Sequence, residues 1–308
     1  MKATIIGLGL IGGSMAIDLR KSGLATELVG IDLNPTYAAK ALELGLVDKI
    51  EKEDKAISHA DLIILAIPVN ALGQLIPSIL DSIKRNAVVI DTGSTKSSIC
   101  RAVSHHPHRA QFVAAHPIAG TENSGPTAAL SGLFRDKTNI ICEQEKSSEH
   151  TLSIAQKVFE ALGMNTIFME PEEHDKHVAY VSHLSHVSSF LLGQTVLDIE
   201  KDEKNIFALA GSGFSSTVRL AKSSPDMWAP IFEQNAEYLS QALLEYIMHL
   251  QKFQYHLMKR DVKELHRAMT DANQIRRVLN GIEAKPQAST PLSLTNKSTN
   301  QQITELSN

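Results

Sequence analysis

The stretch that most constrains the fold of this 308-residue chain is a glycine-rich turn between two apolar runs near its N-terminus. Residues 3–6 form a mostly apolar run, and residues 7–12 read Gly-Leu-Gly-Leu-Ile-Gly. A helical pattern then runs to residue 20, and a second apolar run ends at Asp32. A strand, a G-x-G-x-x-G turn, a helix and a second strand within about 30 residues form the context in which this motif predicts dinucleotide binding. The alternative is a glycine turn without a ligand.

Each glycine of the turn has its own expected task. Gly7 permits the tight turn, Gly9 lets the backbone approach a pyrophosphate, and Gly12 lets helix and strand pack closely. Asp32 stands 20 positions after Gly12, where a carboxylate accepts hydrogen bonds from a ribose 2′-OH. No arginine follows it in residues 33–35, so a 2′-phosphate would meet uncompensated negative charge. We therefore predict NAD, held by Gly7, Gly9, Leu10, Ile11, Gly12, Asp32 and Pro68, which ends the next buried run.

Composition excludes several other classes of protein. The net charge is −4 with acidic and basic residues mixed, so neither nucleic acid nor an anionic membrane surface is expected as a partner. No apolar run approaches the length of a membrane span, and the N-terminus enters a strand without a signal-peptide pattern. The two cysteines, Cys100 and Cys142, form no disulfide framework or zinc pattern. We expect a cytoplasmic protein.

The order of the elements predicts a doubly wound α/β sheet followed by helices. Apolar runs at 61–67, 87–90, 111–115, 138–142 and 165–169 read as strands, and helical patterns separate most of them. After residue 171 the pattern changes to long helices over 173–199, 226–253 and 262–280. From residue 282 the composition turns to Ser, Thr, Asn and Gln, which predicts a disordered tail. The expected domains are therefore 1–170, 171–281 and the tail 282–308.

Two polar residues follow consecutive predicted strands, where ligands of a parallel sheet bind. His116 is a candidate general base because imidazole titrates near neutral pH. The alternative is a loop histidine bonded to the backbone. Ser94 could hydrogen-bond a substrate hydroxyl or merely cap a helix starting near Thr95.

The helical region adds histidines and one arginine. His183 and His186 are three residues apart and share a helix face, a spacing that His174 and His177 repeat. A metal needs more ligands in a defined geometry, so we predict no metal site. Arg219 could clamp a carboxylate with its planar guanidinium, or could be an ordinary surface or ion-pairing arginine.

Five segments in this order, GLGLIGGS, DTGSTK, HPIAGTE, SHLSH and GFSSTVR, resemble the prephenate dehydrogenases, the TyrA family of tyrosine biosynthesis, over residues 1–280. The resemblance implies a Rossmann-type domain, then an all-helical dimerisation domain that forms a homodimer. It implies NAD-dependent oxidative decarboxylation of prephenate to 4-hydroxyphenylpyruvate, with His116 as the catalytic base and Ser94 assisting at the substrate hydroxyl. The residues implied at the substrate are His186, Arg219, Thr121, Glu122 and Trp228, the last contributed across the dimer.

The proposed chemistry needs a neutral base, a positioned nicotinamide and a cation for the carboxylate that is retained, and it needs no metal. Arogenate, which carries an amino acid side chain in place of the pyruvyl group, is the rival substrate. A β-hydroxyacid dehydrogenase would use a helical-domain lysine, for which Lys222 is the nearby candidate, and would leave HPIAGTE unexplained. A non-catalytic NAD-binding redox sensor would have no need for His116 and Arg219 together. Feedback by tyrosine is left open by the sequence.

Overall fold

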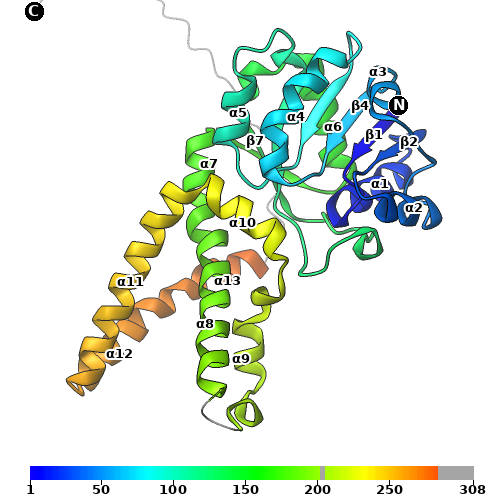
Figure 1. Ribbon diagram of the computed structural model, residues 1–308. Coiled ribbons are helices and arrows are strands. Elements are labelled where there is room, and N and C mark those ends of the chain that lie inside the picture. The colour runs from blue at the N-terminus through cyan, green and yellow to red at the C-terminus, as the bar shows by residue number, and fades with distance from the viewer. Residues whose placement is uncertain (202–204, 284–308) are drawn as a thin grey trace, which may run out of the picture. The chain divides into compact units, whose positions relative to one another are not determined.

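A computed structural model describes residues 1–201 and 205–283, and the predicted tail therefore lies almost wholly outside the described residues. Residues 1–251 form one compact unit, and the residues from 252 onward belong to a second. The first unit is built on a sheet with helices packed around it (Figure 1). The sheet has eight strands in the order β3-β2-β1-β4-β5-β6-β7-β8. The strands are β1 Lys2–Ile6, β2 Glu27–Ile31, β3 Lys49–Ile50, β4 Leu62–Leu65, β5 Val88–Asp91, β6 Phe112–Pro117, β7 Thr138–Cys142 and β8 Asn165–Met169.

The sheet confirms the predicted doubly wound α/β class, with one difference. Strands β1 to β6 pair in parallel, whereas β7 runs antiparallel to β6 and parallel to β8. The order reverses at β1, which lies between β2 and β4. Such a switch point is where open α/β sheets bind ligands, outside the carboxyl ends of the strands.

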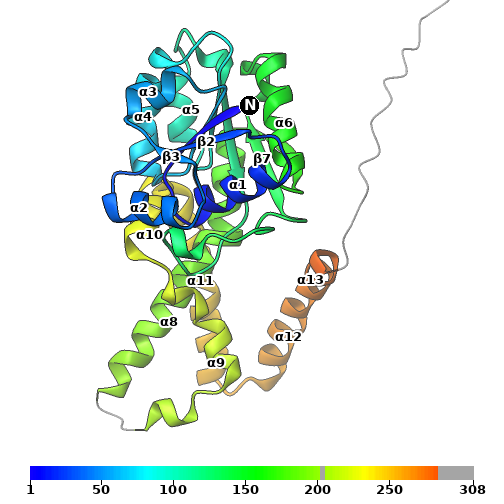
Figure 2. The ribbon, with the colours of Figure 1, turned by 90° about the vertical axis from the view of Figure 1, so that its right-hand side faces the viewer.

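Helices cover both faces of the sheet, which explains why its strands read as continuous apolar runs. Helices α1 (Leu10–Lys21) and α6 (Glu149–Ala161) bury Met15 and Phe159 with Ile5 in one core cluster. Helices α4 (Val69–Ser82) and α5 (Ser97–Val103) bury Ile76 and Ile99 in a second cluster on the other face. Figure 2 shows α4 and α5 on one side of the strands and α6 on the other. The short helices α2 (Pro35–Glu43) and α3 (Glu53–Ser58) complete this part.

The start of α5 corrects one prediction from the sequence. The helix begins at Ser97, and Lys96 precedes it without a side-chain cap, so Ser94 is not the cap. The carboxylate of Asp175, about eighty residues later in the chain, accepts hydrogen bonds from the backbone N–H groups of Lys96 (2.7 Å) and Ser97 (2.8 Å). An acidic side chain at this end also suits the partial positive charge of a helix N-terminus.

After residue 170 every described element is helical, as predicted, but each of the three predicted helices is interrupted. The helix expected over 262–280 is divided by a 3-10 turn at Asn273–Ile275. The helix expected over 173–199 contains a wider π turn at Ala179–His183. The helix expected over 226–253 breaks at Asn235, whose buried amide bonds elsewhere. The helices are α7 Pro171–Val178, α8 Leu184–Glu200, α9 Ser212–Thr217, α10 Pro225–Gln234, α11 Ala236–Met258, α12 Val262–Ala272 and α13 Arg276–Glu283.

Helix α10 packs against α4 and brings helical-region residues to the carboxyl ends of the strands. Gln234 accepts a hydrogen bond from the Thr95 hydroxyl at 2.7 Å and donates to the Val69 carbonyl at 2.9 Å. Trp228 and Ile231 join the second core cluster of the sheet. The compact unit therefore continues to residue 251, and the domain boundary at 170 stays a prediction. Within the described part of the chain, no helix is long and apolar enough to cross a membrane.

Candidate active site

The glycine turn has the geometry that close approach to a ligand requires. Gly7 has a φ of +93°, and a Cβ there would lie 2.3 Å from the Ala66 carbonyl oxygen. A Cβ on Gly12 would lie 1.9 Å from the Gly7 carbonyl oxygen, so both positions exclude a side chain. A Cβ on Gly9 would meet nothing within 4 Å. Gly9, which precedes the first turn of α1, therefore leaves open space beside a helix N-terminus, where anions bind.

Asp32 is fixed against this turn by the backbone. Its carboxylate accepts hydrogen bonds from the N–H of Leu8 (2.8 Å) and from the N–H of Asn34 (2.8 Å). These bonds use one oxygen each, and each oxygen retains a further lone pair. Pro68 lies between the end of β4 at Leu65 and the start of α4, so Asp32 and Pro68 flank the switch point. Leu10 and Ile11, in the first turn of α1, pack partly buried against the first core cluster.

His116 is the penultimate residue of β6, and it begins a series of buried polar contacts. Its Nδ1 is 2.8 Å from Nε2 of His174, and Nδ1 of His174 is 2.8 Å from the Asp175 carboxylate. Burial, and next the neighbouring His174, lower the pKa of His116 well below its ordinary value. Burial also lowers the pKa of His174, against the opposing effect of Asp175. Both imidazoles are therefore neutral at neutral pH.

A buried lysine supports the strand end that carries His116. The ammonium of Lys96 is fully buried, pairs with the carboxylate of Asp91 and donates to the Ala115 carbonyl at 2.7 Å. Asp91 also accepts from the N–H of Ala115 at 3.0 Å. These contacts tie β5 to β6 one residue before His116. Ser94 is half-buried in the same segment between β5 and α5.

The loop after β6 and the helical region meet at one ion pair. Arg219, which follows α9, donates to the Glu122 carboxylate at 3.4 Å. Its side chain is 53 % exposed, so the guanidinium fork is open to solvent and to ligands. Thr121 is exposed, and its hydroxyl accepts from the N–H of Asn123 at 3.2 Å. A long, exposed pair of this kind contributes little to stability.

An aromatic group lies between the ion pair and the buried histidines. The His186 ring stacks on Trp228 with centroids 3.5 Å apart, and His183 meets the same indole edge-on at 5.9 Å. Burial lowers the pKa of His183 to about 4. Burial also lowers the pKa of His186, and the charge of Arg219 adds to this effect. Trp228 thus packs against His183 and His186 of its own chain, and its contribution across a dimer stays a prediction.

One polar atom of this group has no protein partner. The indole Nε1 of Trp228 is buried and lacks a hydrogen-bond acceptor among the described residues. An unpaired buried donor is costly, by roughly 1–3 kcal/mol, unless a ligand or water satisfies it.

Three contributors escaped the sequence analysis. His174 was considered only as a metal ligand, and Asp175 and Asn235 were not singled out at all. Asn235 donates to the Asp175 carbonyl at 2.8 Å and contacts Nδ1 of His183 at 3.0 Å. For Asp175 the available signal was its place next to His174, whereas Asn235 has no histidine near it in the sequence. In the described part of the chain, no three or more His, Cys, Asp or Glu side chains are grouped as metal ligands.

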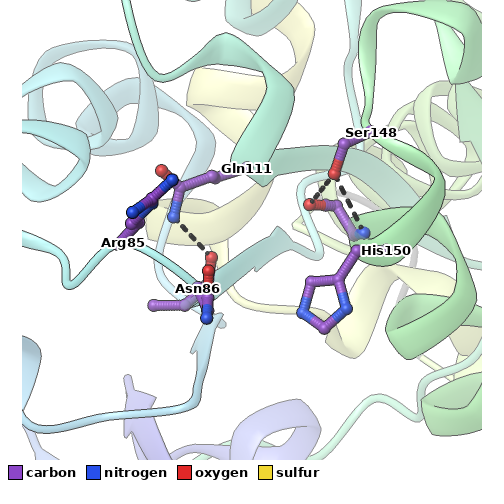
Figure 3. A pocket seen from close by; sticks show the side chains of 7 residues that line it. Arg85, Asn86, Gln111, Ser148 and His150 are labelled. Carbon is purple, nitrogen blue, oxygen red and sulfur yellow. Dashed lines mark hydrogen bonds between the residues drawn. The ribbon is translucent and has the colours of Figure 1, made fainter.

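A separate small pocket lies at the amino ends of the strands, opposite the end that carries the glycine turn and His116. It has a volume of about 230 Å³ and is lined by residues that precede β5, β6 and α6, among them Arg85, Gln111 and Ser148 (Figure 3). Gln111 donates to the Ala87 carbonyl at 2.8 Å there. Because it faces the amino ends of parallel strands, this pocket is not the nucleotide site.

Comparison with known proteins gives consistent findings. A model of the prephenate dehydrogenase nucleotide-binding domain matches residues 15–168, and one of the prephenate dehydrogenase dimerization domain matches residues 170–271. The chain is similar to prephenate dehydrogenase of Bacillus subtilis (strain 168), with 30 % identity over 90 % of this chain and 76 % of that protein.

Two solved structures extend the similarity. One is prephenate dehydrogenase from A. aeolicus in complex with hydroxyphenyl propionate and NAD+, at 30 % identity and a TM-score of 0.83 over 91 % of this chain and 98 % of that one. The other is Synechocystis arogenate dehydrogenase, at 28 % identity and a TM-score of 0.72 over 91 % of this chain and all (100 %) of that one.

Proposed function

Because the chain belongs to the prephenate dehydrogenase family, we propose that it is an NAD-dependent oxidoreductase that converts prephenate to 4-hydroxyphenylpyruvate and CO2 in tyrosine biosynthesis. The observation that carries the proposal is His116, a neutral imidazole near the carboxyl end of β6, on the edge of the sheet where ligands bind. Family membership confirms the resemblance noted from the sequence.

The residues around the glycine turn fit NAD. Gly9 offers open space beside the N-terminus of α1 for a pyrophosphate, and Asp32 retains lone pairs for ribose hydroxyls. Its negative charge disfavours a 2′-phosphate, and no arginine follows it in residues 33–35. When bound, NAD+ accepts the hydride of the reaction. The relative from A. aeolicus was solved with NAD+, which supports the same choice here.

The site residues divide the remaining work between them. His116 takes the proton of the substrate hydroxyl through the ring nitrogen that does not face His174, and Ser94 hydrogen-bonds the same hydroxyl. Arg219 holds the side-chain carboxylate. Pairing a fixed cation with the ring carboxylate instead would stabilise the charge that must disappear as CO2. His186, Thr121 and Glu122 contact the substrate from the same side as Arg219.

Arogenate is the second candidate substrate, favoured by Glu122 beside Arg219 and by the similarity to an arogenate dehydrogenase. The two substrates differ in a keto group against an ammonium. The indole N–H of Trp228 has no acceptor in the part of the chain that the structure describes, and it adjoins the His186–Arg219 side of the site. A donor can bond a keto oxygen but repels an ammonium, which favours prephenate.

The deciding experiment measures kcat/KM for purified prephenate and arogenate with NAD. We expect prephenate to be preferred, and we expect Trp228→Phe to narrow that preference. Arg219→Gln should raise KM for either substrate by about 10-fold or more, since a charge-assisted hydrogen bond is worth roughly 1.5–3 kcal/mol. A clear arogenate preference would overturn the substrate, and no turnover of either would leave only cofactor binding, as in a redox sensor.

We further propose a homodimer formed by the helical region. Its matching family model is a dimerization domain, and α8 and α11 expose large apolar side chains such as Leu191, Leu197 and Leu244. A second copy of the chain would cover them. Light scattering of the active protein tests this, and a monomer would refute it. A cytoplasmic location is in keeping with Cys100 and Cys142, which are buried and free.

A further inference from the structure

Hydrogen bonds link His116, His174 and Asp175 in series, and they determine which nitrogen of each imidazole carries hydrogen. The series starts at the Asp175 carboxylate. Burial alone would raise the pKa of Asp175, but hydrogen bonds from His174 and Ser97 outweigh burial and hold that pKa below its usual value. Asp175 is therefore an anion at neutral pH and can only accept hydrogen bonds.

The charge of Asp175 determines where the hydrogen lies on His174 and then on His116. Since Asp175 only accepts, Nδ1 of His174 carries the hydrogen that lies between them. His174 is neutral, so its Nε2 has none and accepts from Nδ1–H of His116, 2.8 Å away. His116 is neutral as well, which leaves its Nε2 as a bare lone pair.

We propose that His174 and Asp175 are positioning residues that hold His116 in the tautomer with hydrogen on Nδ1 and a bare Nε2, ready to accept the substrate proton. The proposal rests on the function proposed above for His116. When Nε2 takes the hydroxyl proton, the ring gains a positive charge, and the Asp175 anion stabilises it through His174. The O–H bond of the substrate breaks, an N–H bond forms on Nε2, and the proton remains on His116 until it passes to solvent.

The surroundings make the arrangement rigid. Asp175 is fixed by the backbone N–H groups of Lys96 and Ser97 at its carboxylate and by Asn235 at its carbonyl. Because these contacts fix the Asp175 carboxylate, the hydrogen bond from Nδ1 of His174 to that carboxylate holds the imidazole in one orientation. This is the precision that general-base geometry needs.

The groups that face His116 come from several elements. From α7 they are His174 and, behind it, the Asp175 anion. Lys96, which pairs with the buried Asp91, also lowers the pKa of His116, and the π turn adds His183, whose own pKa burial lowers to about 4. Asp175 is thus the anion that offsets the new charge on His116.

The first test compares three variants with a matched control. His174→Leu removes both hydrogen bonds, whereas His174→Gln keeps a donor and an acceptor on a side chain of similar reach. His177→Leu is the control, because His177 is exposed on the same helix, α7, three residues away. Asp175→Asn keeps the shape of the side chain but removes its negative charge.

We expect kcat to fall by about 10²–10⁴-fold in His174→Leu and Asp175→Asn, the range for general acid–base work, with KM nearly unchanged. His174→Gln should recover at least about 10-fold over His174→Leu, and His177→Leu should match the wild type. Bound NADH fluorescence and thermal melts establish that each variant is folded. Equal losses in the Gln and Leu variants, or a fully active Leu variant, would overturn the proposal.

The pH profile gives a readout that packing alone would not move. In the wild type, kcat/KM falls in acid as His116 is protonated, with a midpoint below the ordinary histidine pKa. Asp175→Asn removes the anion that stabilises imidazolium, so the midpoint moves to lower pH. If Asp175→Asn lowers the rate and leaves the midpoint in place, Asp175 has only a structural role.

A spectroscopic measurement separates this inference from the proposed function. The 15N spectrum of histidine-labelled protein, minus that of His116→Gln, reports which nitrogen of His116 carries hydrogen. We expect Nδ1–H in the wild type and a mixture of the two tautomers in His174→Leu, which removes the acceptor for Nδ1–H. If neither substrate is turned over but Nδ1–H is observed, the proposed function fails and the tautomer assignment stands. Nε2–H in the wild type would refute the assignment itself.

Discussion

Replacing Gly9 with alanine should make the folded chain more stable while abolishing its response to the cofactor. The backbone at Gly9 has a φ of −77° and a ψ of −157°, which alanine adopts, and its Cβ would meet nothing within 4 Å. A Gly→Ala change at a compatible position stabilises by about 0.4–1 kcal/mol, mainly by restricting the unfolded chain. For a domain of this size that raises Tm by about 1–4 °C.

The same methyl group projects into the space where the pyrophosphate would lie. A ligand at 100 times its Kd stabilises a protein by about 2.7 kcal/mol, so NADH should raise the wild-type Tm well beyond the effect of the mutation. In Gly9→Ala we expect most of that NADH-dependent rise to disappear, together with NADH fluorescence enhancement. The assay is differential scanning fluorimetry with and without NADH, followed by direct titration.

Two further glycines calibrate the result. Gly73→Ala, inside α4 with its nearest contact 3.9 Å away, should stabilise the chain and leave the NADH response intact. Gly12→Ala should destabilise the chain, because its Cβ would lie 1.9 Å from a carbonyl oxygen. The reasoning is refuted if Gly9→Ala binds NADH like the wild type, or if it melts below the wild type without ligand.

Three further outcomes follow from the site. Asp32→Ser should narrow the preference for NAD over NADP, and a wild-type preference for NADP in parallel kinetics would contradict the role of Asp32. His116→Asn should lower kcat by about 10²–10⁴-fold while NADH binding survives, and substantial turnover in this variant would move the base elsewhere. His183, with a pKa of about 4, is neutral when folded and takes up a proton when unfolded, so its contribution is complete above pH 6.5 and is lost as pH falls toward 4. From pH 7 to pH 5 this costs about 2 kcal/mol of unfolding free energy. Urea titrations at both pH values should show a smaller loss of unfolding free energy in His183→Gln than in the wild type. An equal loss in the two proteins would contradict this role of His183.

The parts of the fold whose signals lie close together in the sequence could be predicted, and the parts that depend on distant contacts could not. The glycine turn and Asp32 could be predicted because strand, turn and helix signals lie within one short segment. The antiparallel direction of β7 could not, since Thr138–Cys142 is equally apolar in either orientation. Only the register against β6 distinguishes the two.

The base of the candidate site could be predicted from the sequence, but the residues that support it could not. His116 was found because it follows a buried run, whereas its supporting contacts come from α7, 58 residues later in the sequence. The start of α5 was misplaced because its cap, Asp175, is supplied from outside the local sequence. The break at Asn235 was missed since apolar periodicity continues on both sides of it, and only the buried bond to Asp175 explains it.

The placement of Asp175 has a consequence for the newly made protein. A ribosome releases the nucleotide-binding strands first, and the His116 segment emerges long before the segment that carries Asn235. Until α7 and α10 arrive, α5 lacks its carboxylate, and His116 lacks the partner that sets its tautomer. The part of the chain that binds cofactor can thus be complete while the base is not. Competence for chemistry therefore arrives only with the C-terminal half of the polypeptide.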